Sequence, residues 1–177
     1  MAAQTHSRAA GRTAGIPVGT DLGLLFLRVI LGGLFMGHGL GKLFGWFGQG
    51  GIDGTAAFFK AVGYEPAKQL VVMDGIFELA AGAMLLAGFL IPLAAAIIIG
   101  DMMNAAVVKS PHGFWVANQG FEYEFVIMIL LLALTITGAG AYALDRNREW
   151  FGSRTAGFAV AVVLGVIGGV AMLIVRK

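Results

Sequence analysis

The sequence predicts an all-α integral membrane protein, a bundle of about five transmembrane helices. Of its 177 residues, 58% are hydrophobic and 12% are charged, whereas soluble domains average about 45–50% apolar and about 25% charged residues. The mean hydropathy is +0.85. Apolar runs close to the roughly 20 residues that cross a hydrocarbon layer of about 30 Å recur along the chain. No alternating pattern typical of a membrane barrel is present.

Each apolar run has recognisable limits. The first run follows Thr20 and Asp21, which suit a helix N-cap. It is long, contains Arg28 and lacks a clear cleavage site, so we interpret it as a retained helix rather than a signal peptide. A tight turn at 88–92 separates the second and third runs, and Pro92 suits the first turn of a helix. The predicted spans are 21–43, 69–90, 92–108, 121–144 and 155–175.

The segments between the spans carry interfacial signals. In the longest connection, residues 55–62 could form an amphipathic helix with Phe58 and Phe59 in lipid and Lys60 in water. The three tryptophans fall near predicted helix ends, as in the aromatic belts of membrane proteins. They are Trp46, Trp115 and Trp150.

Small-residue spacing predicts where helices approach one another closely. Gly33, Gly37 and Gly41 have this spacing in the first span, and Gly165 and Gly169 have it in the fifth. The fifth span contains no charged residue and lies beyond the other four. We therefore expect it to be dispensable for a central site and to contact another helix, in this chain or in a second copy as a homo-oligomer.

Composition excludes several classes of function. The chain has no cysteine, which excludes a disulfide, a catalytic thiol and an iron–sulfur cluster held by this chain. Its formal charge is +2 and its basic residues form no stripe, so we expect no nucleic-acid partner. The short loop 145–154 carries three arginines. By the positive-inside rule, we expect a multi-pass protein of the cell (inner) membrane with a cytoplasmic N-terminus and an outer C-terminus.

Ionisable residues within the spans are the strongest functional signal, since each costs several kcal/mol in a bilayer. At 1.5 Å per residue, Arg28 lies about 10 Å into its helix, and Glu78 and Asp101 lie about 13 Å into theirs. We therefore predict that Arg28 pairs with Glu78 or Asp101 near the membrane centre, and that the remaining acid stays protonated and can relay a proton. These three are the candidate catalytic residues. The alternative is an inert ion pair that holds helices together.

Further polar residues lie towards the face that bears the 43–68 and 109–120 loops. Helical spacing places Asp74 beside Glu78, and His38 beside Lys42. We expect a cavity that opens on this face and binds a cofactor, with a quinone as the candidate. No HExxH motif or second histidine pair is present, so we expect neither a metal nor a haem. The candidate cofactor-binding residues are His38, Lys42, Asp74, Asn104, His112 and Glu122.

Several of these residues occur in a familiar order. The run HGLGKL at 38–43, preceded by Arg28, resembles the first-helix signature of the DoxX family. Glu78 within FELAAG resembles the acid of that family's second helix, and Asp101 followed by HGFW at 112–115 resembles its third helix and next loop. The resemblance continues through 120–125 and 138–145. It implies a polar N-terminal tail at 1–20, a four-helix core at 21–145, and an added basic loop and fifth helix at 146–177.

The resemblance also implies a function. The family includes a membrane subunit of a thiosulfate:quinone oxidoreductase. It also includes a membrane partner of a superoxide dismutase and a thiosulfate sulfurtransferase in a complex that counters oxidative stress. A quinone-linked subunit of a redox complex, or a membrane anchor for soluble redox partners, is therefore the leading hypothesis. A small-molecule transporter or channel and a non-catalytic scaffold are the alternatives.

Overall fold

In a computed structural model, residues 18–146 and 148–177 are described, and this part of the chain is all-α, with no strand. The all-α membrane class is confirmed. Residues 1–17 of the expected polar tail lie outside the described residues, while residues 18–20 already belong to the first helix. The α-helices are α1 (Val18–Phe44), α2 (Gly51–Ala61), α3 (Ala67–Ala87), α4 (Ile91–Lys109), α5 (Glu122–Thr137) and α6 (Arg154–Ile174).

Four described helices are long and apolar enough to cross a membrane: α1, α3, α4 with its short extension to His112, and α6. The helix expected at 121–144 is shorter than predicted. It has 16 residues, or about 24 Å, and ends where Gly138 and Gly140 adopt positive φ angles. The five predicted apolar segments are thus all helical, but the fourth does not reach the length of a full span.

The non-helical segment 138–145 folds back into the molecule. Backbone N–H groups of Leu144 and Asp145 donate to the carbonyls of Ala87 and Gly88 at 3.1 and 3.0 Å. The N–H of Ala141 donates to Asp21 Oδ1 at 2.8 Å. Irregular backbone at membrane depth is tolerated when its polar groups are bonded within the protein, and these bonds meet that requirement.

Helices α1 and α3 are antiparallel and cross at paired glycines. A Cβ atom on Gly32 would lie 2.7 Å from the Gly82 oxygen, and one on Gly39 would lie 2.7 Å from the Gly75 oxygen. Only glycine permits backbones to approach this closely. These contacts fix which residues of α1 stand level with which residues of α3.

The glycine stripe predicted on the first helix is not the one in contact with α3. Gly33 has no neighbour within 4 Å of a built Cβ, whereas Gly37 and Gly41 face side chains of the following turn, Phe47 and Gln49. Gly32 and Gly39 are seven residues apart, so the crossing has a heptad spacing instead of the four-residue spacing that we expected.

Helices α4 and α6 are parallel and equally close. A Cβ on Gly165 would lie 2.8 Å from Ile99 Cγ2, and one on Gly169 would lie 3.2 Å from Met103 Cβ. The glycine pair predicted on the last helix therefore does form a close contact, but its partner is α4 of the same chain. Because α6 covers α4 directly, we now expect this helix to support the bundle; its dispensability for a central site stays a prediction that truncation tests.

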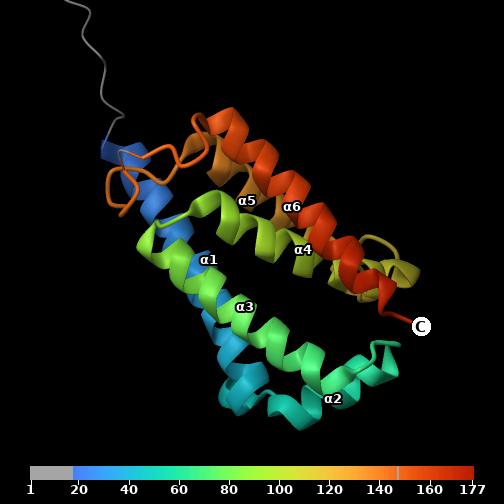
Figure 1. The fold of residues 1–177 in the computed structure, drawn as a ribbon. Coiled ribbons are helices and arrows are strands. Elements are labelled where there is room, and N and C mark those ends of the chain that lie inside the picture. Colours follow the sequence, from blue (N-terminus) through green and yellow to red (C-terminus); the bar gives the residue numbers. More distant parts are fainter. Residues whose placement is uncertain (1–17, 147) are drawn as a thin grey trace, which may run out of the picture.

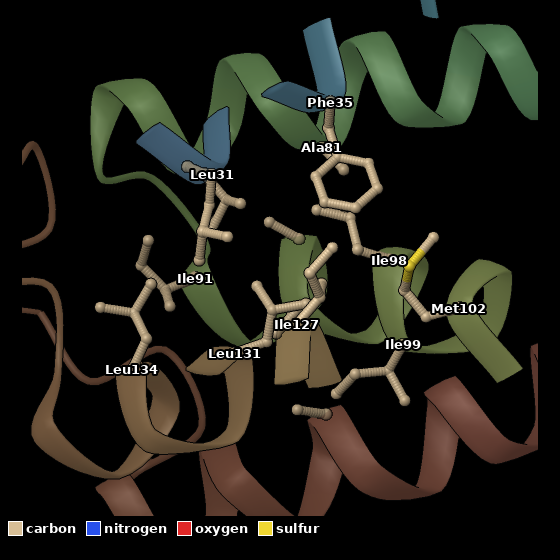
Figure 2. Close-up of a cluster of buried hydrophobic side chains, with 14 of the residues drawn as sticks. Leu31, Phe35, Ala81, Ile91, Ile98, Ile99, Met102, Ile127, Leu131 and Leu134 are labelled. Carbon is tan, nitrogen blue, oxygen red and sulfur yellow. The ribbon is translucent and has the colours of Figure 1, made fainter. Parts of the chain in front are cut away.

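Figure 1 shows the two groups of helices: α1, α2 and α3 in one arm, and α4, α5 and α6 in the other, diverging from the α3–α4 turn. The apolar core lies where the arms meet. Figure 2 shows Phe35 of α1 near Ile98 of α4, with Leu31 of α1 and Ile127 and Leu131 of α5 in the same cluster. The core therefore ties the arms together near their junction and does not extend to their far ends.

The connection between α1 and α3 contains the expected amphipathic helix. α2 begins at Gly51, somewhat earlier than predicted; Phe58 and Lys60 are exposed, and Phe59 is partly buried. Trp46, Trp115 and Trp150 are 55%, 62% and 46% exposed and lie near helix ends. This placement agrees with an aromatic belt.

A lysine and three acids in the candidate ligand cavity

A lysine and two acids of neighbouring helices form the centre of the candidate site. The Lys42 ammonium on α1 lies 2.5 Å from Asp74 Oδ2 and 3.0 Å from Glu78 Oε2 on α3. Asp74 accepts a hydrogen bond from it, whereas the contact with Glu78 lacks the alignment of one. The Glu78 side chain is 3% exposed and that of Lys42 is 15% exposed. This is a largely buried ionic contact inside a membrane domain.

Asp101 brings a third carboxyl group from the other arm. Oxygen atoms of Asp74, Glu78 and Asp101 all lie within 4.8 Å of one another. Asp101 Oδ2 is buried and has no hydrogen-bond partner among the described residues. Buried polar atoms without a partner are rare and often mark a place for a water or a ligand.

One ammonium therefore faces three carboxyl groups. Three convergent carboxyl oxygens can also hold a hard metal ion, but here the Lys42 ammonium stands at contact distance from two of them. A single positive charge balances one carboxylate, and further negative charge in a low-dielectric region is costly. The cluster therefore holds more carboxyl groups than one lysine can neutralise.

The cluster lies in the wall of a large cavity between the two arms. This cavity has a volume of about 1030 Å³ and is lined by residues of all six helices, mostly apolar. Met73 and Phe77 of α3 and Leu164 of α6 line it and are also 38%, 47% and 43% exposed. The cavity therefore opens between α3 and α6 onto a surface that faces lipid.

A second ion pair, with a buried carboxylate and a partly exposed lysine, lines the same cavity. Lys109 at the end of α4 donates to Glu124 Oε1 on α5 at 2.6 Å, and the Glu124 side chain is 3% exposed. His112 and His38 also line the cavity. His112 is exposed, whereas the ring of His38 stacks at a tilt against Phe35, 6.2 Å between centroids.

Asn104 lines the cavity but is already fully engaged. Its Oδ1 accepts from the Tyr64 hydroxyl at 2.9 Å, and its Nδ2 donates to the carbonyls of Gly100 and Gly169 at 2.8 and 3.1 Å. Burial raises the pKa of the Tyr64 hydroxyl, so this group remains a proton donor. Asn104 therefore joins α4, α6 and the α2–α3 loop, and we assign it a structural part in place of the cofactor contact that we expected.

Backbone contacts near Tyr64 reinforce this connection. The N–H of Lys177 donates to the Gly63 carbonyl at 2.8 Å, and Arg176 Nε donates to the Val62 carbonyl at 2.9 Å. Together with the Tyr64–Asn104 bond, these contacts link the two arms at the wide end of the cavity, where Figure 1 shows the C-terminus beside the α2 arm.

Arg28 is not part of the cluster, and its predicted pairing with Glu78 or Asp101 is wrong. It lies 14 residues before Lys42 on α1, or about 21 Å along the helix. Its Nη2 donates to the Tyr142 carbonyl at 2.6 Å. Its Nη1 fills the space in which a Cβ of Gly88 would lie, at the α3–α4 turn. No described carboxylate forms a salt bridge with it.

The error has a physical origin. Our depth estimate measured each residue from the predicted start of its own helix, as though all helices began at one level. The glycine crossings of α1 and α3 set the actual register, which places Lys42 beside Asp74 and Arg28 beside the end of α3. Arg28 thus holds segment 138–145 against the bundle instead of neutralising the acids.

Glu122 also differs from its prediction. Its Oε2 accepts the N–H of Val116 at 2.9 Å, which fixes the loop before α5, and it does not line the cavity. Sequence reasoning placed Glu124 on the face of the expected cavity but missed Tyr64 and Lys109 as cavity residues, and with Lys109 the ion pair to Glu124. A signal existed for the pair, because opposite charges flank one loop at adjoining helix ends. We find no comparable signal for Tyr64.

Comparison with known families agrees with this geometry. The DoxX family model matches residues 23–116, which is more than half of the chain. The matched region contains α2, α3, α4 and most of α1, and therefore Lys42, Asp74, Glu78 and Asp101. No curated protein and no solved structure matches the chain. The chain belongs to the DoxX family.

Proposed function

We propose that this protein is the membrane subunit of a redox complex and that it binds a quinone in the cavity between its arms. The observation that carries this proposal is the combination of one lysine and three carboxyl groups with an otherwise apolar cavity that opens towards lipid. A quinone needs the same combination, because its ring exchanges protons and its tail is a hydrocarbon.

The residues present fit such a ligand. Cavities for organic ligands usually measure about 300–1,000 Å³ and are mostly apolar with a few convergent polar groups, and this cavity of about 1030 Å³ is at the upper end. Lys42 and His38 supply donors for a carbonyl oxygen. The unpartnered Asp101 Oδ2 supplies a buried acceptor or, when protonated, a donor.

We assign the chemical roles by position. A quinone, when bound, supplies the capacity to carry two electrons and two protons. Glu78 and Asp101 hold protons at the cavity wall, and Lys42 stabilises whichever carboxylate is ionised. The apolar residues of α3 and α6 exclude water and admit the ligand from the bilayer.

Electrons have to come from elsewhere in the complex, because the chain contains no cysteine for an iron–sulfur cluster or redox thiol. Soluble partners are therefore part of this proposal, and the resemblance to the DoxX family points to a superoxide dismutase and a thiosulfate sulfurtransferase. The plasma membrane, with loop 145–154 on its cytoplasmic side, is the proposed location.

A transporter is the second candidate, and the same acid cluster favours it. Intramembrane carboxyl groups often bind coupling ions or relay protons in transporters. The two functions differ in their requirements: flux through a transporter should proceed without a quinone, whereas activity of a redox subunit should depend on one.

Binding of a short-chain quinone, decylubiquinone, to the purified protein tests the proposal. We compare wild type with Glu78→Gln and Asp101→Asn, which preserve shape but cannot hold a proton in the same way. Asp53→Asn is the matched control, since the Asp53 side chain is 83% exposed and outside the cavity.

We expect saturable binding to wild type and to the control, and at least about tenfold weaker binding to Asp101→Asn, the loss of about one charge-assisted hydrogen bond. Glu78→Gln should bind but fail to support quinone-dependent turnover in the assembled complex. Equal, non-saturable partitioning into all four proteins would reject the quinone site.

A further inference from the structure

A second cavity lies at the opposite end of the molecule, where α6 begins. Its volume is about 570 Å³, and it shares no described lining residue with the first cavity. Arg146, Arg148 and Arg154 line it, and all three are exposed. The ion pairs of the described residues all involve lysines, so these guanidinium groups have no such carboxylate partner.

Three carboxyl groups lie in the same wall, but only one of them is accessible to a ligand. Asp21 and Asp145 are buried, and each already accepts a backbone N–H, from Ala141 and Leu90 respectively. Glu149 is exposed. A ligand that enters from outside therefore meets three guanidinium groups and one accessible carboxylate, which favours an anion.

The position of the cavity selects the kind of anion. It lies at the N-terminal end of the 21-residue helix α6, where the helix dipole adds partial positive charge. Trp150 and Phe151 line it and are 46% and 37% exposed, as is typical of residues at the headgroup level. Arg148 covers the Trp150 ring at 5.4 Å.

Guanidinium groups match the geometry of phosphate oxygens and bind them through paired hydrogen bonds. Basic pockets at the membrane surface between transmembrane helices commonly hold phospholipid headgroups. We propose that this cavity is a binding site for a phosphate group at the membrane surface, supplied by the headgroup of an anionic phospholipid or by a soluble phosphate ester.

Thermal unfolding of the full chain in detergent tests the site with three added probes: phosphatidylglycerol, phosphatidylcholine and soluble glycerol 3-phosphate. The variant replaces Arg146, Arg148 and Arg154 with glutamine. The matched control replaces three exposed lysines that lie elsewhere, Lys60, Lys68 and Lys177, with glutamine.

We expect phosphatidylglycerol to stabilise wild type and control at concentrations about tenfold or more below those that the arginine variant requires. An equal effect of glycerol 3-phosphate would identify a soluble ester as the source, and an effect of the lipid alone would identify a headgroup. Equal stabilisation of wild type and arginine variant, or of wild type by phosphatidylglycerol and phosphatidylcholine, would overturn the proposal.

Should the arginine variant not fold, mass spectrometry of wild type with its retained lipids decides the question. The site requires that the protein, equilibrated with an equimolar mixture of the two lipids, keep phosphatidylglycerol preferentially. The proposed site is contradicted if the protein retains the two lipids in the ratio in which they were mixed and glycerol 3-phosphate does not stabilise it.

Discussion

Lys42 Nζ lies 2.5 Å from Asp74 Oδ2 across the α1–α3 contact. This ion pair stands at the inner wall of the larger cavity, beside Glu78 and Asp101. Its position depends on the glycine crossings at Gly32 and Gly39, because these contacts set the register in which α1 and α3 face each other. The electrostatics of the candidate site therefore follow from the packing of two apolar helices.

Replacing this lysine should destabilise the protein in a pH-dependent manner. Lys42→Met leaves three buried carboxyl groups without a cation, and removing one partner of a buried pair costs about 3–5 kcal/mol. Lowering the pH protonates the acids and removes their repulsion, so the loss of stability should be larger at pH 8 than at pH 5. Thermal unfolding at both pH values measures this, with the exposed Lys60→Met as control. A loss that is the same at both pH values would show that the acids are already neutral.

Arg28 should matter for folding and not for the ligand. Arg28→Leu leaves the Tyr142 carbonyl without its donor, at a cost of about 1 kcal/mol, and should loosen segment 138–145. Decylubiquinone binding by the folded fraction should remain as in wild type, because Arg28 does not line the larger cavity. Hydrogen exchange of residues 138–145 and a binding titration measure the two effects separately. If quinone binding is lost while residues 138–145 keep their normal protection from hydrogen exchange, Arg28 takes part in ligand binding after all.

The α4–α6 contact offers a matched pair of glycines on one helix. A Cβ on Gly165 would meet Ile99, whereas one on Gly168 has nothing within 4 Å. Gly165→Ala should destabilise the protein by about 1–3 kcal/mol through overpacking. Gly168→Ala should be neutral or stabilising by up to about 1 kcal/mol because alanine favours helix. Thermal unfolding compares them, and equal effects would argue against the close helix contact.

Removal of α6 should now be more harmful than the sequence suggested. Truncation after Ser153 exposes the buried face of α4 and removes the Gly169 carbonyl that accepts from Asn104. We expect loss of the monodisperse folded protein in size-exclusion chromatography. A stable, monodisperse truncated protein would show that the four-helix core folds without α6, as the sequence suggested.

The start of α1 and the start of α6 lie at the same end, while Gly63 and Lys177 meet at the other end. Cysteines at Glu149 and at Lys60 should therefore react from opposite sides of the membrane. With the N-terminus inside, a membrane-impermeant maleimide should label Lys60→Cys in intact cells and leave Glu149→Cys unlabelled until lysis. The reverse pattern would invert the orientation, and labelling of both would contradict the fold.

Hydropathy predicted the helices well because a bilayer demands long apolar runs, and α1, α3, α4 and α6 each match one. It failed at the end of α5, where positive φ angles at Gly138 and Gly140 stop the helix although the run 138–144 remains largely apolar. Bonds to Ala87, Gly88 and Asp21 replace the helical bonds there, and such long-range partners leave no local signal.

The acids of the candidate site were recognisable because charge inside a span needs a reason. Their cation was not, since Arg28 and Lys42 lie on the same helix and the choice between them depends on register. Gly32 and Gly39 set that register, yet the neighbouring Gly33, Gly37 and Gly41 fit the familiar spacing better. A single sequence cannot show which of these glycines forms the crossing, because every glycine in such a helix permits a close approach.

Photolabelling with an azido-quinone tests the central claim most directly, since it reports where the ligand lies. The purified protein is illuminated with the probe, with and without excess decylubiquinone, and the labelled peptides are sequenced. The account predicts label on the cavity faces of α3 and α6, near Met73, Phe77 and Leu164, that the competitor suppresses and that Asp101→Asn reduces. Label spread over all lipid-facing helices and unaffected by the competitor would contradict it.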